Sequence, residues 1–132
     1  MTEPGVPVRI TRGVPVVIAP QEIDITNAGQ LRAALLRAAA RPAAALVVDM
    51  TRTQFCDSAG LHALIGAHKR ARAEGRQVRL AVTGPQVRRI LALTALDRLI
   101  PVYASLDHAL AHPPRRHRRP WAPAACFTGE GL

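Results

Sequence analysis

The part of the chain with the clearest chemical potential is a single run of seven residues, Phe55–Leu61, which reads Phe-Cys-Asp-Ser-Ala-Gly-Leu. An apolar run that ends at Met50 precedes it and apolar residues at helical spacing follow it. We therefore expect a buried strand, a loop and then a helix that begins at Ser58. The first N–H groups of a helix have no partner within the helix, and the helix dipole favours negative charge beside them. A phosphoryl group on Ser58 would bring about −1.5 to −2 charges to this position. The segment thus favours a serine that can carry phosphate; the simpler interpretation is that Ser58 is only the N-cap of the helix.

Cys56 suggests a different hypothesis, because a thiolate is favoured just before the N-terminus of a helix. His62 and His68 lie on the expected helix, so a Cys/His nucleophile is one candidate. No third group that would orient the histidine is evident. We therefore interpret Cys56 as a semi-buried thiol under the loop and His68 as part of the core-facing stripe of the helix.

Several kinds of catalytic and metal site lack their usual sequence patterns. There is no Gly-x-Ser-x-Gly turn around Ser58, since position 56 is Cys. The chain has no Cys-x-x-Cys or His-Glu-x-x-His spacing for a metal, and no Gly-x-x-x-x-Gly-Lys loop for ATP. We expect no catalytic residue, metal or cofactor, and a phosphate acceptor rather than an enzyme.

The elements that must position Ser58 alternate along the chain. Two β-branched runs joined by Thr11-Arg12-Gly13 predict a hairpin, and the apolar run at 44–48 predicts a strand covered on both faces. An alternating strand is expected at 77–82 and a short one at 100–103, while 51–56 is expected to be a loop. Amphipathic helices are expected after N-cap residues at Asp24–Asn27, from Ser58 to near Gly75, after Gly84-Pro85, and from Ser105 or Asp107 to Leu110. The order ββαβαβαβα predicts an α/β fold: a mostly parallel sheet of four or five strands with an antiparallel N-terminal hairpin strand and helices packed on it.

The composition narrows the class of protein further. A length of 132 residues is typical of one domain, and two cysteines exclude a disulfide scaffold. No apolar run approaches the roughly 20 residues that span a bilayer, and the first residues do not form a signal peptide. We expect a cytoplasmic protein without membrane insertion.

The net charge of +9 is unevenly distributed. Residues 112–132 are rich in Pro and Arg and show no periodicity, so we expect a domain over residues 1–111 followed by a disordered basic tail. A basic chain can attract nucleic acid, which makes a small nucleic-acid-binding protein one alternative. Only four aromatic residues are available to stack on bases. We therefore expect no specific nucleic-acid partner and a flexible, solubilising tail.

The chain from about Val6 to Ala111 resembles the STAS family, and more narrowly the bacterial anti-sigma factor antagonists. The Asp-Ser-Ala-Gly-Leu motif is specific only in its context of an apolar strand before it and a helix after it. Here the order of elements is the same as in the family. The residues that carry the resemblance are Asp49-Met50, the run Phe55–Leu61, Gln21-Glu22-Ile23-Asp24 after the second strand, the Gly84-Pro85 turn, and Leu93-Thr94-Ala95-Leu96. The chain departs from the family at Gln21, where Gly is frequent, and at His62, where a small or apolar residue is common.

What the resemblance implies is a switch operated by phosphorylation. Ser58 matches the serine that a partner anti-sigma factor, itself a serine kinase of the GHKL type, phosphorylates, and a PP2C-like phosphatase resets it. The unphosphorylated form binds the anti-sigma factor and frees a sigma factor, so the chain would regulate transcription. Asp24 matches an acidic position in the loop beside the serine, and Asp57 matches the acid before it. The implied partner-binding residues are Asp24, Asp57, Ser58, Ala59, Gly60 and Leu61.

The same fold allows another role. A STAS module can serve as a scaffold or a regulatory subunit, for example of a transporter, without phosphorylation of the serine. That interpretation predicts the same helices and strands but no regulation by phosphorylation of Ser58.

Overall fold

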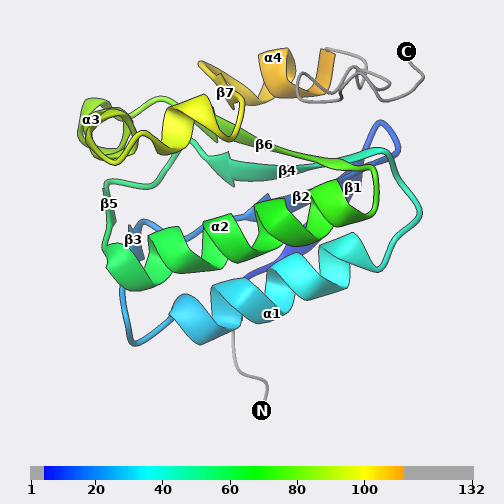
Figure 1. Cartoon of the computed structure of the whole chain (residues 1–132), viewed down its shortest axis with the longest axis horizontal. Coiled ribbons are helices and arrows are strands. Elements are labelled where there is room, and N and C mark those ends of the chain that lie inside the picture. Colours follow the sequence, from blue (N-terminus) through cyan, green and yellow to red (C-terminus); the bar gives the residue numbers. More distant parts are fainter. Residues whose placement is uncertain (1–4, 112–132) are drawn as a thin grey trace.

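The structure is a computed structural model that describes residues 5–111. Its strands are β1 (Val8–Thr11), β2 (Val14–Ile18), β3 (Glu22–Ile23), β4 (Ala45–Met50), β5 (Phe55–Cys56), β6 (Gln77–Val82) and β7 (Val102–Tyr103). Its helices are α1 (Ala28–Ala39), α2 (Ser58–Ala73), α3 (Pro85–Leu93) and α4 (Leu106–Ala111), with a single 3-10 turn at Leu96–Arg98. A sheet in the order β1-β2-β4-β6-β7 separates α1 and α2 on one face from α4 on the other (Figure 1). The buried residues of α3, Val87 and Leu91, belong to the core on the α1 and α2 side.

The sheet has the predicted mixed topology. β1 pairs with β2 antiparallel, and the remaining neighbours in the five-stranded sheet pair parallel. The hairpin turns at Arg12 and Gly13, which have φ values of 54° and 78°. Positive φ at both central residues is what a two-residue turn needs to match the twist of its strands. The predicted α/β fold with an antiparallel N-terminal strand is therefore confirmed.

The main core lies between the sheet and the pair α1 and α2. The apolar run predicted to be covered on both faces is β4, in which Val47 and Val48 are fully buried. On α1 the predicted stripe is buried, and it consists of Leu31, Ala34, Leu35 and Ala38. A smaller cluster on the opposite face joins Val16 and Val47 to Ala109 of α4. These two clusters fix the sheet on which the site is built.

Residues 51–56 were expected to form a loop, and this prediction is wrong for the last two of them. Phe55 and Cys56 form β5, which pairs parallel with β3 in a separate two-stranded sheet. Ile23 and Cys56 point into the core and are buried, while Glu22 and Phe55 point outward. Two-residue strands have no periodicity to detect, and these two form because residues far apart in the chain meet beside the start of α2 (Figure 1).

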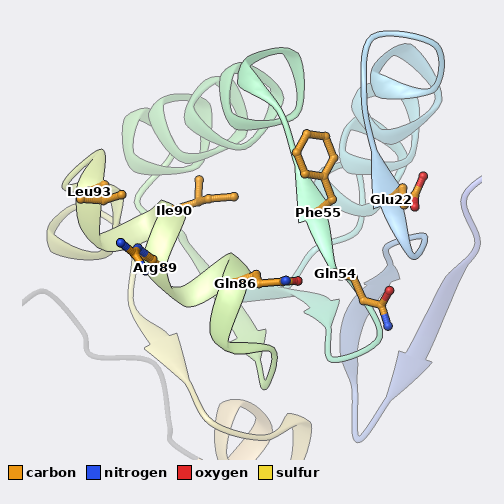
Figure 2. Close-up of a pocket in the computed structure, with 7 residues that line it drawn as sticks. All are labelled: Glu22, Gln54, Phe55, Gln86, Arg89, Ile90 and Leu93. Atoms are coloured by element: carbon orange, nitrogen blue, oxygen red, sulfur yellow. The ribbon is translucent and has the colours of Figure 1, made fainter.

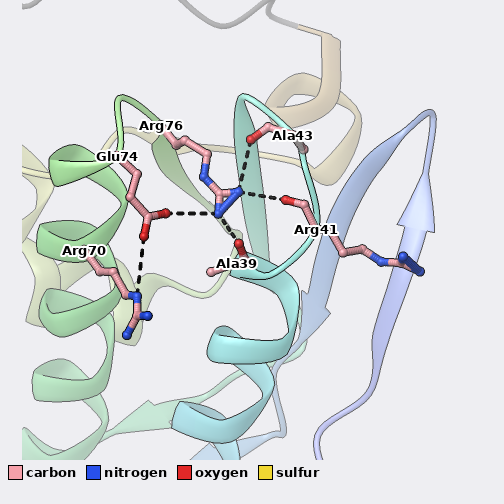
Figure 3. Close-up of polar contacts among 6 residues, drawn as sticks. All are labelled: Ala39, Arg41, Ala43, Arg70, Glu74 and Arg76. Atoms are coloured by element: carbon pink, nitrogen blue, oxygen red, sulfur yellow. Dashed lines mark hydrogen bonds and ion pairs between the residues drawn. The ribbon is translucent and has the colours of Figure 1, made fainter.

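The far end of α1 and α2 is held by Arg76, which follows α2 (Figure 3). Its guanidinium donates hydrogen bonds to the carbonyl oxygens of Ala39, Arg41 (2.8 Å) and Ala43 (3.3 Å). The last carbonyls of a helix have no partner within it, and a cation nearby also suits the helix dipole. Arg76 therefore ties the exit of α1 to the end of α2, at the opposite end from Ser58.

The C-terminal elements differ in detail from the prediction. The last strand begins at Val102 rather than residue 100, and of the two predicted caps for α4 it is Ser105 whose hydroxyl oxygen accepts from His108 N–H at 3.0 Å. Arg79 is buried although the alternation of β6 suggested one exposed face, because α4 covers it. Its guanidinium donates to the carbonyl oxygen of Ala109 at 2.8 Å. The predicted tail, 112–132, lies outside the described residues.

The helices of residues 5–111 include none with the length and apolar character needed to cross a membrane.

Candidate functional site

Ser58 is the first residue of α2, as predicted, but the expectation that it is the N-cap is wrong. Asp57 occupies that position with an extended backbone, and its carboxylate accepts hydrogen bonds from the N–H groups of Ala59 (2.9 Å) and Gly60 (3.2 Å). Aspartate and serine are comparable N-caps, and here the one that comes first in the chain takes the role. Within residues 5–111 the exposed Ser58 hydroxyl has no hydrogen-bond partner.

The start of α2 therefore offers a hydroxyl group that is not used to hold the helix together. The first turn itself contains no acidic residue, so a phosphoryl group on Ser58 would join only the Asp57 carboxylate that caps it. Such a charge is favourable at a helix N-terminus. The cap bonds come from Asp57 and do not involve the Ser58 hydroxyl.

The two-stranded sheet brings Asp24 to this corner from a distant part of the chain. β3 and β5 run parallel, and the N–H of Asp57 donates to the carbonyl oxygen of Ile23 at 3.0 Å. Asp24 and Asp57 are the residues that follow these two strands, so both leave the same edge next to Ser58. The structure thus groups three of the residues that the resemblance singled out.

A tight turn fixes the loop that carries Asp24. Its carboxylate accepts hydrogen bonds from the N–H and the hydroxyl of Thr26, and these two donors lower the pKa of Asp24 below its usual value. Asn27 lies at the N-cap position of α1 but makes no capping bond. Its side chain instead accepts from Asp24 N–H (2.9 Å) and donates to the carbonyl oxygen of Glu22 (2.8 Å). The capping role expected for Asn27 is therefore replaced by a role in holding the Asp24 loop.

The other residues expected to bind a partner differ in exposure. Ala59 and Leu61 are half-buried, and Leu61 packs against the main core. Gly60 is buried, and a Cβ built on it would lie 2.5 Å from Cγ2 of Ile23 and 2.6 Å from the sulfur of Cys56. This close approach of α2 to the two short strands was missed in the sequence analysis. A glycine in the first turn of a helix is the only signal that could have indicated it.

The environment of Cys56 argues against a thiolate nucleophile. Burial raises the pKa of Cys56 to about 12, and the neighbouring charge of Asp57 adds to the effect. The helix N-terminus favours the thiolate, but the cost of burying that charge outweighs this effect, because Cys56 is only 2% exposed. Cys56 is a buried thiol of the core, as the simpler interpretation had it.

The two histidines of α2 lie in different surroundings. His62 is exposed, whereas His68 is buried on the core-facing side, as predicted. Burial lowers the pKa of His68, and the nearby charges of Arg72 and Lys69 act in the same direction. In the described part of the chain, no three side chains of the metal-binding types come together.

A groove that the sequence analysis did not anticipate lies beside the corner, between α3 and the two-stranded sheet (Figure 2). Its volume is about 500 Å³. The residues that line it are Glu22, Gln54, Phe55, Gln86, Arg89, Ile90 and Leu93. Phe55 belongs to β5, the strand that leads directly to Asp57 and Ser58, so the groove lies next to the corner in the chain.

The fold and this corner define a class of protein: a small α/β domain that presents an unused serine hydroxyl at the start of a helix, between two carboxylates. The chain belongs to the STAS domain family, whose model matches residues 6–109.

The crystal structure of an anti-sigma factor antagonist from Mycobacterium paratuberculosis is similar, with 33% identity, a TM-score of 0.73, and coverage of 83% of this chain and 96% of that one. The anti-sigma F factor antagonist of Paenibacillus polymyxa is 28% identical over 100 residues, which are 75% of this chain and 86% of that protein. A protein of Mycobacterium tuberculosis named as an anti-anti-sigma factor is 35% identical over 91 residues; the match takes in 67% of this chain and 62% of that protein's length, which is less than two thirds.

Two more distant structures show the fold alone. SpoIIAA of Bacillus in its phosphorylated form is 21% identical, with a TM-score of 0.61 and coverage of 80% of this chain and 96% of that one. A sulfate transporter family protein of Wolinella succinogenes is 20% identical, with a TM-score of 0.67 and coverage of 78% and 86%.

Proposed function

We propose that this chain is an anti-sigma factor antagonist that is switched by phosphorylation of Ser58. The observation that carries the proposal is the exposed Ser58 hydroxyl at the first turn of α2, which Asp57 leaves free by capping the helix itself. The similarity to anti-sigma factor antagonists supports the general role. The unphosphorylated chain binds its anti-sigma factor, a GHKL-type serine kinase, and thereby frees a sigma factor. A PP2C-like phosphatase restores this form.

The binding surface in this proposal is the corner around Ser58. Asp24, Asp57 and the first turn, Ser58 to Leu61, face the partner there. Asp24 is held in place by Thr26 and Asn27, so it is ordered before the partner arrives. A preorganised surface loses little conformational freedom on docking, which favours affinity.

Phosphorylation changes this surface without unfolding it. A phosphoryl group adds bulk and about −1.5 to −2 charges at the centre of the interface. The phosphoryl charges lie beside the carboxylates of Asp24 and Asp57. The phosphoryl group must also lose its bound water when a partner docks, which costs free energy. The helix N-terminus stabilises the phosphorylated form of the free chain, whereas the interface opposes it. The switch therefore acts on binding rather than on folding.

The chain itself performs no reaction in this scheme. It is the acceptor of the phosphoryl group, and the kinase supplies ATP and the catalytic groups. The proposal needs no cofactor in this chain and places it in the cytoplasm, where ATP and sigma factors are found.

The experiment that tests the proposal compares binding of a candidate anti-sigma kinase to three variants of the full chain. Ser58→Ala is expected to bind at least as well as the parent and to stay bound when Mg-ATP is added. Ser58→Asp is expected to bind at least tenfold more weakly. Ser105→Ala, which removes the only other serine of the chain, is expected to behave as the parent does. Equal binding of Ser58→Ala and Ser58→Asp would instead support a STAS scaffold or transporter subunit that works without phosphorylation.

A further inference from the structure

The groove beside the corner exposes apolar side chains that are normally covered. Phe55 is 47% exposed and Leu93 is 76% exposed, and both line the groove together with the half-buried Ile90 (Figure 2). Its volume of about 500 Å³ is within the range of sites that hold a bulky side chain or a ligand. Contiguous exposed apolar surface of this kind commonly marks a binding site.

The groove and the neighbouring corner carry charged side chains. Glu22 is paired with Phe55 across the two short strands, and Asp24 and Asp57 follow at the same edge. Of these three carboxylates, Glu22 lines the groove itself, while Asp24 and Asp57 are the residues that follow the two strands. On the opposite wall, Arg89 of α3 lies near Leu93 (Figure 2). An occupant that fits this surface has an aromatic or apolar part and a basic part.

The chain carries such a segment beyond the described residues. In the sequence of 112–132, four arginines at positions 115–119 precede the apolar run Trp121–Phe127, which reads Trp-Ala-Pro-Ala-Ala-Cys-Phe. The described part ends with α4, which lies on the face of the sheet opposite to α1 and α2 (Figure 1). At about 3.3 Å per residue, Trp121 can lie up to about 33 Å from Ala111. A domain of this size has a radius of gyration of only about 13 Å, so the length suffices.

We propose that the segment 112–132 binds back onto its own domain, with Trp121 in the groove and the arginines beside Glu22, Asp24 and Asp57. The indole would cover Phe55, Ile90 and Leu93, and an aromatic side chain of this size buries about 150–250 Å². Arg89 lies where its guanidinium can pack on the indole face. The opposite charges set the direction in which the segment lies. The segment is then an intramolecular ligand and not only a solubilising tail.

This contact also covers the neighbourhood of Ser58, which is three residues after Phe55 along the chain. In that position the segment competes with any protein that docks on the corner. This consequence rests on the proposed function, whereas the contact itself does not require phosphorylation or a partner. The contact can therefore be tested on the purified chain alone.

Trp121 provides the probe, because it is the only tryptophan of the chain. In the full chain its fluorescence is expected at a shorter wavelength, and with weaker quenching by acrylamide, than in the free peptide 112–132. Leu93→Ser and Phe55→Ser are each expected to move the emission towards that of the peptide. Leu36→Ser removes an exposed leucine of α1 that does not line the groove, and is expected to leave the emission unchanged. Far-UV circular dichroism confirms that each variant is folded.

Three outcomes would overturn the proposal. The first is emission from the full chain that equals the emission of the peptide. The second is a shift with Leu36→Ser as large as the shift with Leu93→Ser, since Trp121 would then lie elsewhere. The third is a blue shift that disappears on dilution, which would assign the contact to a second copy of the chain. A shift that is independent of protein concentration and decreases at high salt is the expected result, because the arginine contacts are screened by ions.

Discussion

Gly60 lies so close to Ile23 that a methyl group on its α-carbon would be 2.5 Å from Cγ2 of the isoleucine. This contact seats the first turn of α2 on the two short strands, and the same turn carries Ser58. The glycine at this position is therefore explained by packing within the domain. Contact of this turn with a partner is not needed to explain why residue 60 is a glycine.

Replacement of Gly60 by Ala is expected to destabilise the domain. Overpacking of a well-filled core costs about 1–3 kcal/mol, and the better helix propensity of Ala returns at most about 1 kcal/mol. Gly66→Ala is the matched control on the same helix, since a Cβ there meets nothing within 4 Å. It is expected to raise the free energy of unfolding by about 0.5–1 kcal/mol. Urea unfolding measures both changes in the free energy of unfolding when the variants have the same m-value. A Gly60→Ala variant that is as stable as Gly66→Ala would contradict the close packing of Gly60 on Ile23.

The cap at Asp57 leads to a second prediction. Asp57→Ala removes the acceptor for two N–H groups and is expected to lower the free energy of unfolding by about 0.5–2 kcal/mol. Asp57→Asn keeps a side-chain oxygen at the cap and is expected to lie within a few tenths of a kcal/mol of the parent. Ser58→Ala is expected to change the stability little, because Ser58 does not cap the helix. A larger loss with Ser58→Ala than with Asp57→Ala would reverse the assignment of the cap.

Much of this fold follows from sequence pattern, and the exceptions have physical reasons. The stripe of α1 was predicted from its helical spacing, and the strand β4 was predicted from its continuous apolar run. β3 and β5 were missed because two residues cannot show a period. They form only where Ile23 and Cys56 are buried together beneath Gly60. Such short elements are decided by tertiary contacts, which a local pattern does not contain.

The geometry of the candidate site was only partly predictable from the sequence. Ser58, Asp57 and Asp24 were identified through a motif and a resemblance, and the structure brings them to one corner. The exchange of roles between Asp57 and Ser58 at the cap was not predictable, since both residues are good N-caps. The groove at Phe55 and Leu93 could not be found either, because an exposed apolar residue in a sequence looks the same as a buried one.

The buried thiol of Cys56 gives a prediction about pH. Its pKa is about 12 in the folded domain against an ordinary value of 9.0. Below about pH 9 both the folded and the unfolded thiol are protonated, so Cys56 contributes no pH dependence there. Above that pH the unfolded chain loses the proton and the folded chain keeps it. Stability therefore falls as pH rises, by at most about 1.4 kcal/mol per pH unit.

The comparison that isolates this effect uses the Cys126→Ser variant, in which Cys56 is the only thiol left. Unfolding is measured at about pH 8 and about pH 10, with and without a further Cys56→Ala change. The loss of stability between the two pH values is expected to be larger when Cys56 is present. Labelling of Cys56 by iodoacetamide is also expected to be much slower in the folded chain than in urea. Rapid labelling of the folded chain would show that the thiol is accessible after all.

The proposed switch depends on the transfer of a phosphoryl group to Ser58. The most direct measurement is mass spectrometry of the full chain after incubation with a cognate anti-sigma kinase and Mg-ATP, followed by peptide mapping. The account predicts the mass gain of one phosphoryl group, located on Ser58, and no gain in Ser58→Ala. It also predicts that Ser105→Ala is modified to the same extent as the parent. A chain that binds such a kinase but gains no phosphoryl group, or gains it at another residue, would contradict the account.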